Sequence, residues 1–263
     1  MSTSNGAALT FAERMGVAAL DIAAKTGGIA IMAAQIIRRL VPPTVDRYEM
    51  VRNLYRMGVK SVPILSATAF FTGAIMVIQA APVVQQFNAK NFVGWSAIFT
   101  TFREIGPLLI ALMFNGRVGA NNTAELGTMV VTEQIDALRA LAIDPISYLV
   151  VPRVISMITV MTALVIVGDF LSIIGGMLMA WAMLDIYPVA FYHSALPMLD
   201  SWDFYVGVIK AFLYGVMISM TSCYFGLATS GGAAGVGRSV NTSVVAAASG
   251  VFIADYLSTF VLG

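Results

Sequence analysis

Residues 61–89 carry the sequence SVPILSATAFFTGAIMVIQAAPVVQQFNA, a stretch without one charged side chain. A helix that crosses the hydrocarbon core of a bilayer needs about 20 mostly apolar residues, so this stretch predicts a transmembrane helix over 61–86. The whole chain of 263 residues has the same character, with 59% apolar and 11% charged residues. Soluble domains carry about 25% charged residues. The composition therefore excludes a disordered chain, a coiled coil and an ordinary soluble enzyme, and it indicates a polytopic membrane protein.

Four further stretches are long and apolar enough to cross a membrane. The predicted spans are 61–86, 93–116, 154–184, 204–229 and 241–262. We therefore predict an all-α integral membrane protein with five transmembrane helices, formed by residues 61–263 as one domain. The chain shows no internal repeat, and an inverted-repeat carrier fold has no support for that reason.

Residues 1–60 form a separate N-terminal segment in this interpretation. Its uncharged run, Thr26–Ile37, has only 12 residues, and runs of 10–14 residues are more typical of interfacial than of spanning helices. We predict an interfacial helical arm over 12–40, ended by Pro42-Pro43. An alternative is that the arm crosses the membrane, with Asp21 and Lys25 paired four residues apart on one side of the helix.

The Lys and Arg residues are distributed unevenly over the predicted loops. Twelve lie in the N-terminal segment and in the loops on its side of the membrane, and one, Lys90, lies on the other side. By the positive-inside rule, this predicts a cytoplasmic N-terminus and, after five spans, a periplasmic C-terminus.

The segment 117–153 is the one long polar stretch between two spans. Asn122 and Glu125 have the spacing of a helix-starting box, and Asp144-Pro145 is typical of a helix end. We predict an amphipathic cytoplasmic helix over 121–144. Amphipathicity alone leaves two interpretations open: the helix rests on the membrane or on its own bundle, or it docks on a soluble partner.

The region Arg103–Arg153 resembles the signature region of the MlaE/YrbE permeases, the membrane subunits of Mla- and Mce-type lipid ABC transporters. The matching motifs are Arg103-Glu104-x-Gly106-Pro107, Gly116-Arg117-x-Gly119, Ala124-Glu125-Leu126-Gly127-Thr128-Met129, Thr132-Glu133-Gln134-Ile135-Asp136-Ala137 and Asp144-Pro145. Their order and spacing hold over about fifty residues.

The resemblance implies a multi-pass permease of the bacterial inner membrane that moves phospholipid-like molecules. It implies three protein partners: a second copy of the chain, an ABC ATP-binding subunit and an MCE-domain lipid-binding protein. The permease itself needs no cofactor, since its partner uses the ATP. Residues 121–144 correspond to the helix that couples to that partner. The candidate coupling residues are Glu125, Thr132, Glu133, Asp136 and Arg139.

Charged side chains inside the predicted spans are the other candidates. Arg103 and Glu104 are neighbours, and neighbouring side chains on a helix point about 100° apart, so they cannot pair with each other. Each therefore needs another partner, and Lys210 and Asp169 are the candidates, because they also lie within spans. Such a network either fixes helix packing or forms a polar site in a lipid cavity. Arg103, Glu104 and Lys210 are our candidate lipid-cavity or gating residues.

Three other functions are alternatives to transport by an ABC system. A proton- or ion-coupled secondary carrier would use Glu104, Asp169 and Asp255 as a relay. An intramembrane enzyme is disfavoured, because the chain has one histidine and one cysteine, His193 and Cys223, in unrelated segments; this also disfavours a metal centre. A scaffold that binds partners without transport is the third. The net charge of +1 gives no sign of nucleic-acid binding.

Overall fold

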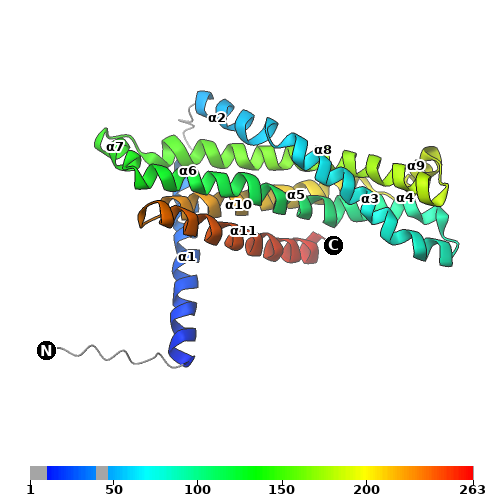
Figure 1. Ribbon diagram of the computed structural model, residues 1–263, viewed down its shortest axis with the longest axis horizontal. Helices are drawn as coiled ribbons and strands as arrows, with labels where there is room; N and C mark the ends of the chain where they lie inside the picture. The colour runs from blue at the N-terminus through cyan, green and yellow to red at the C-terminus, as the bar shows by residue number, and fades with distance from the viewer. Residues whose placement is uncertain (1–10, 40–46, 263) are drawn as a thin grey trace.

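The computed structural model describes residues 11–39 and 47–262, and every regular element in these ranges is a helix (Figure 1). The predicted break at Pro42-Pro43 lies outside these residues. The first half contains α1 (Phe11–Arg39), α2 (Arg47–Leu54), η1 (Tyr55–Val59), α3 (Val62–Gln86), η2 (Lys90–Phe92), α4 (Val93–Thr100), η3 (Thr101–Ile105), α5 (Gly106–Phe114), η4 (Asn115–Gly119), α6 (Ala120–Val131) and α7 (Gln134–Ala140). The second half contains η5 (Ile146–Val150), α8 (Val151–Leu184), α9 (Pro188–Ala195), α10 (Ser201–Leu227) and α11 (Gly232–Leu262). The all-α fold class is thus confirmed.

Six helical segments in the described residues are long and apolar enough to cross a membrane. They are Met15–Arg39, Tyr48–Gln86, Lys90–Val131, Ile146–Leu184, Ser201–Leu227 and Gly232–Leu262. The last five overlap the five predicted spans. The first falls on the predicted interfacial arm. Length and composition alone therefore give six candidate spans in the described residues, and the predicted number of five is approximate.

The direction of α1 sets it apart from the other five segments. In Figure 1, α1 projects from the bundle and runs across the direction that α3, α8 and α11 share. A helix lying crosswise to a spanning bundle suits the interfacial arm better than a sixth span. The Asp21–Lys25 pair required by the alternative is nevertheless present, at 2.6 Å between Lys25 Nζ and Asp21 Oδ2. At its end, α1 is fastened by an ion pair of 2.6 Å between Arg39 Nε and Asp144 Oδ2.

The predicted cytoplasmic helix 121–144 differs from the structure. No helix begins at Asn122; one unbroken helical segment runs from Lys90 to Val131. A shorter helix, α7, follows after Glu133, which adopts a left-handed backbone with φ +61°. The reason is that Asn122 is fully buried and uses its side chain for contacts with other helices rather than as a helix cap.

Glycines allow α3 and α8 to approach each other closely. A Cβ atom on Gly73 would lie 1.8 Å from the backbone oxygen of Ser172, and one on Gly175 would lie 2.0 Å from that of Phe70. Ser172 also donates a hydrogen bond of 2.7 Å to the carbonyl oxygen of Ala69. Small residues at the crossing point are a common means of packing membrane helices, because helices in lipid gain little from burying apolar side chains.

Candidate functional site

Lys210 on α10 is the centre of a charged cluster inside the bundle. Its side chain is 0% exposed. Its Nζ lies 2.7 Å from Glu104 Oε1 in η3 and 3.1 Å from Asp255 Oδ1 in α11. One ammonium group therefore serves two carboxylates from two other helices, and the three charges sum to −1.

Two hydroxyl groups complete the cluster. Thr259 donates to Glu104 Oε1 at 3.1 Å and accepts from Lys210 Nζ at 2.8 Å. Tyr214 donates to Asp255 Oδ1 at 2.7 Å. Buried charges are tolerated only with such pairing and hydrogen bonding. Glu104 differs from Lys210 in its exposure, because 36% of the Glu104 side chain is exposed.

Arg103 contacts a different partner from its neighbour. Its Nη1 lies 3.3 Å from Asp203 Oδ1, its Nη2 donates to the carbonyl oxygen of Leu262 at 3.2 Å, and its guanidinium lies 5.3 Å from the ring centre of Phe99. Asp203 also belongs to the capping box that begins α10. The expectation that Arg103 and Glu104 find separate partners is therefore confirmed, and Lys210 is the partner of Glu104.

Asp169 does not join this cluster, which corrects the expectation that it closes the network. It is buried in α8, and neither carboxylate oxygen has a hydrogen-bond partner among the described residues. Its carboxylate instead packs against Gly106, where the missing side chain leaves room for it. A Cβ atom on Gly106 would lie 2.2 Å from Asp169 Oδ1. Arg103 and Glu104 reach their partners from η3, a single π-helical turn. Such turns alter the direction of side chains in a way that a regular 3.6-residue pattern does not reveal.

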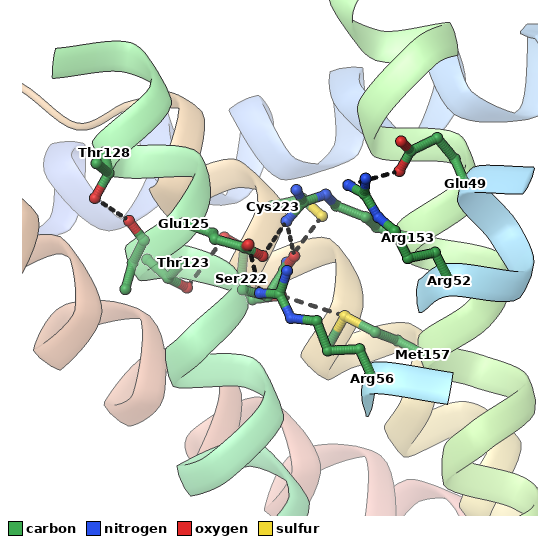
Figure 2. Close-up of polar contacts among 12 residues, drawn as sticks. Glu49, Arg52, Arg56, Thr123, Glu125, Thr128, Arg153, Met157, Ser222 and Cys223 are labelled. Atoms are coloured by element: carbon green, nitrogen blue, oxygen red, sulfur yellow. Dashed lines mark hydrogen bonds and ion pairs between the residues drawn. The ribbon is translucent and has the colours of Figure 1, made fainter. Parts of the chain in front are cut away.

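A second polar cluster lies further along the same long helix. Glu125 of α6 accepts from Arg153 of α8 at 3.0 Å and pairs with Arg56 of η1. Figure 2 shows the Glu125 carboxylate between the two guanidinium groups. At about 1.5 Å per residue, Glu125 is roughly 30 Å along the helix from Glu104. It thus joins three elements at one end of the bundle.

Buried amide and hydroxyl groups extend this second cluster into the core. Asn122 accepts from Arg153 at 3.0 Å and donates to Ser222 at 2.9 Å and to Cys223 at 3.3 Å. Thr123 donates to the carbonyl oxygen of Ser222 at 3.1 Å (Figure 2). The cluster therefore ties α6 to α8 and α10.

The five candidate coupling residues fall into two groups. Glu125 lies within the second cluster, whereas the other four lie at or beyond the end of α6. Asp136 and Arg139 of α7 form an exposed ion pair of 2.9 Å. Thr132 and Glu133 form the joint between α6 and α7. The structure therefore separates Glu125 from the exposed group.

Several members of these clusters were missed by sequence reasoning. Asp203 falls just before the predicted span 204–229, and the sequence indicates no partner for Tyr214, Thr259, Asn122 or Arg153. The contacts that place them in the two clusters join residues 28 to 155 positions apart, so no local spacing reveals them. The one available signal was the rarity of charges in apolar stretches, which did single out Arg103, Glu104, Lys210 and Asp255. Among residues 11–39 and 47–262, no group of three metal-ligating side chains is present.

Long apolar helices that enclose paired charges, with a short polar helix at one end, define a multi-pass membrane protein. The chain matches the family model described as Permease MlaE over residues 50–261, and it belongs to that family.

Curated relatives cover nearly the whole chain. It is 36% identical over 251 residues to a probable ABC transporter permease protein of Rickettsia felis, covering 95% of this chain and 97% of the relative. It is 34% identical to a probable ABC transporter permease protein of a Synechocystis strain, covering 88% of each. It is also 34% identical to the protein TRIGALACTOSYLDIACYLGLYCEROL 1, chloroplastic, of Arabidopsis thaliana, covering 88% of this chain and 67% of the relative.

Proposed function

We propose that this permease moves phospholipid-like molecules between the bacterial inner membrane and an MCE-domain lipid-binding protein. It acts as a dimer, and each copy is driven by an ABC ATP-binding subunit. The permease contributes no ATPase site and no cofactor. Residues 61–263 form the permease domain, the N-terminus is cytoplasmic, and the C-terminus is periplasmic.

The cluster around Lys210 is the observation that carries the lipid assignment. A charged side chain inside a membrane is energetically costly. Such residues therefore usually line a substrate or ion pathway or act as the counter-ion of a ligand. Glu104 is paired yet open on one side, so it can meet a polar headgroup without leaving Lys210 unpaired. The Arabidopsis relative, whose name contains that of a galactolipid, supports a lipid as the transported molecule.

The short helix α7 supports the coupling to an ATP-binding subunit. It stands at the end of the long segment Lys90–Val131 and exposes Asp136 and Arg139 with both signs of charge. A helix that lies on lipid favours Lys and Arg on its polar side. The mixed charges of α7 therefore favour a protein partner, for which they provide specificity.

The contacts of the three carboxylates disfavour the ion-coupled carrier. Such a carrier needs Glu104, Asp169 and Asp255 in one relay. Glu104 and Asp255 meet at Lys210, whereas Asp169 makes no side-chain hydrogen bond within the described part of the chain and packs against Gly106.

The test is lipid transfer by the reconstituted complex of permease, ATP-binding subunit and MCE-domain protein. We expect transfer of a fluorescent phospholipid to require ATP and to be insensitive to a proton ionophore. The variant Glu104→Ala is expected to keep assembly and ATP hydrolysis but to transfer less lipid, while the exposed control Asp21→Ala transfers normally. Transfer that follows a proton gradient in the absence of ATP would favour the carrier instead.

A further inference from the structure

A basic cavity lies beside the second cluster and is distinct from the charges around Lys210. Its volume is about 340 Å³. Three cationic residues line it, Arg56, Lys60 and Arg117, together with the polar residues Ser61 and Asn121. Among the residues that the structure describes, no acidic side chain lines it. The walls come from the segment before α3 and from η4 and α6.

The charge in this cavity is only partly compensated. Arg56 pairs with Glu125, which approaches from outside the cavity. Arg117 donates to the backbone oxygen of Lys60, and neither Arg117 nor Lys60 has a carboxylate partner among the described residues. Two positive charges are therefore left over in one concave site.

One residue that lines the cavity, Ser61, carries an unpaired hydroxyl group, which is a second observation in favour of a ligand. Ser61 is 1% exposed, and its Oγ has no hydrogen-bond partner in the described structure. It precedes the first residue of α3 but makes no side-chain capping bond. Buried hydroxyl groups are rarely left unpaired.

The cavity lies at the depth where two apolar stretches end. The uncharged stretch 61–89 begins at Ser61, and the uncharged stretch 105–116 ends next to Arg117. The cavity is also about 20 Å along the helix from the beginning of α7, at 1.5 Å per residue. These positions correspond to the headgroup layer of the membrane rather than to the tip that carries α7.

We propose that this cavity binds a phosphate group, carried by an anionic phospholipid of the leaflet on that side. The two cations Lys60 and Arg117 and the unpaired hydroxyl of Ser61 are donors of the kind that a phosphate oxygen accepts from. Basic pockets between membrane helices bind lipid headgroups in this way. The bound lipid holds the beginning of α3 against η4 and does not need to be the transported molecule.

Binding is tested on the purified full-length permease complex in detergent, by the thermal shift that added lipid produces. We expect phosphatidylglycerol to raise the melting temperature and diacylglycerol, which lacks the phosphate, to have no effect. The double variant Lys60→Gln, Arg117→Gln is expected to bind phosphatidylglycerol at least about tenfold more weakly, from the loss of two charge-assisted contacts. The control Lys25→Gln, on α1, keeps the wild-type shift.

A milder variant protects the test against misfolding. This variant is Ser61→Ala. If the Ser61 hydroxyl donates to a bound phosphate, Ser61→Ala reduces the lipid-induced shift in melting temperature. If no phosphate binds there, the shift stays unchanged. An undiminished shift in both Ser61→Ala and the double variant overturns the proposal. Equal protection by inorganic phosphate, with none by phosphatidylglycerol, overturns the lipid source. The readout is binding, so its result is independent of lipid transfer.

Discussion

Glu104 and Asp255 lie on different helices and share one counter-ion, the buried ammonium of Lys210. The distances from Lys210 Nζ to the two carboxylates are 2.7 Å and 3.1 Å. The three residues are therefore not equivalent. Removal of Glu104 leaves Lys210 paired with Asp255, whereas removal of Lys210 leaves two carboxylates in the membrane without a cation.

The first prediction follows from this inequality. We expect Lys210→Met to destabilise the permease by about 3–5 kcal/mol, the cost of stranding a buried charge. Glu104→Ala is expected to cost clearly less, because Asp255 remains. Thermal unfolding of the purified complex measures both, with Lys25→Met as the exposed control. Equal losses for Lys210→Met and Glu104→Ala would contradict the shared arrangement.

The second prediction concerns the crossing of α3 and α8. A side chain at Gly73 or Gly175 meets backbone atoms of the other helix, which cannot move aside as a side-chain end does. We expect Gly73→Val or Gly175→Val to lower the yield of folded permease and its melting temperature, by the equivalent of about 1–3 kcal/mol or more.

The control for the crossing is Gly237→Ala. Nothing lies within 4 Å of a Cβ at this position in α11, and alanine is favoured over glycine in a helix by about 0.5–1 kcal/mol. Gly237→Ala is therefore expected to be neutral or stabilising. A neutral Gly73→Val would show that the two helices do not cross as closely as described.

The apolar stretches made much of the fold predictable, and the polar residues made the rest difficult. The stretch at 61–89 identified α3, because hydrophobicity over 20 residues is a local property. The spacing of Asn122 and Glu125 indicated a helix start, yet Asn122 bonds Arg153 and Ser222 instead. Whether a buried asparagine caps a helix or bonds to other helices depends on the neighbours that it has in the folded chain.

The candidate site was predictable to the same extent. A charge in an apolar stretch stands out, which identified Glu104 and Lys210 and suggested that they meet. Asp169 stands out equally, yet it packs on the backbone at Gly106. Sequence spacing does not tell which of several intramembrane charges face each other, since that depends on the rotation of each helix and on the π-helical turn η3.

The third prediction tests α7 as the docking helix. We expect Asp136→Lys or Glu133→Lys to weaken co-purification of the ATP-binding subunit, because a reversed charge at a polar interface is repulsive. The permease itself should remain folded, since Asp136 and Arg139 are exposed. The matched control is Asp185→Lys, an exposed acidic residue after α8. Normal recovery of the partner in both α7 variants would rule this helix out as the contact.

The fourth prediction concerns topology. The sole native cysteine, Cys223, is buried, so an introduced cysteine is labelled against a silent background. We expect Ser201→Cys to react with a membrane-impermeant maleimide in spheroplasts and Arg238→Cys to react only after the membrane is opened, as the distribution of Lys and Arg requires. The reverse pattern would invert the assigned orientation.

The segment Lys90–Val131 has a mechanical consequence, because it holds Glu104 and ends at the joint to α7. Its 42 residues make a rod of about 60 Å, twice the thickness of the hydrocarbon core. Glu104 and Thr132 lie about 40 Å apart along it, so a tilt of roughly 5° displaces one relative to the other by about 4 Å. With α7 as the proposed docking helix, a small displacement at this end of the segment would shift the Glu104 carboxylate by ångströms, and the left-handed joint at Glu133 would determine how much of the motion of α7 reaches the segment.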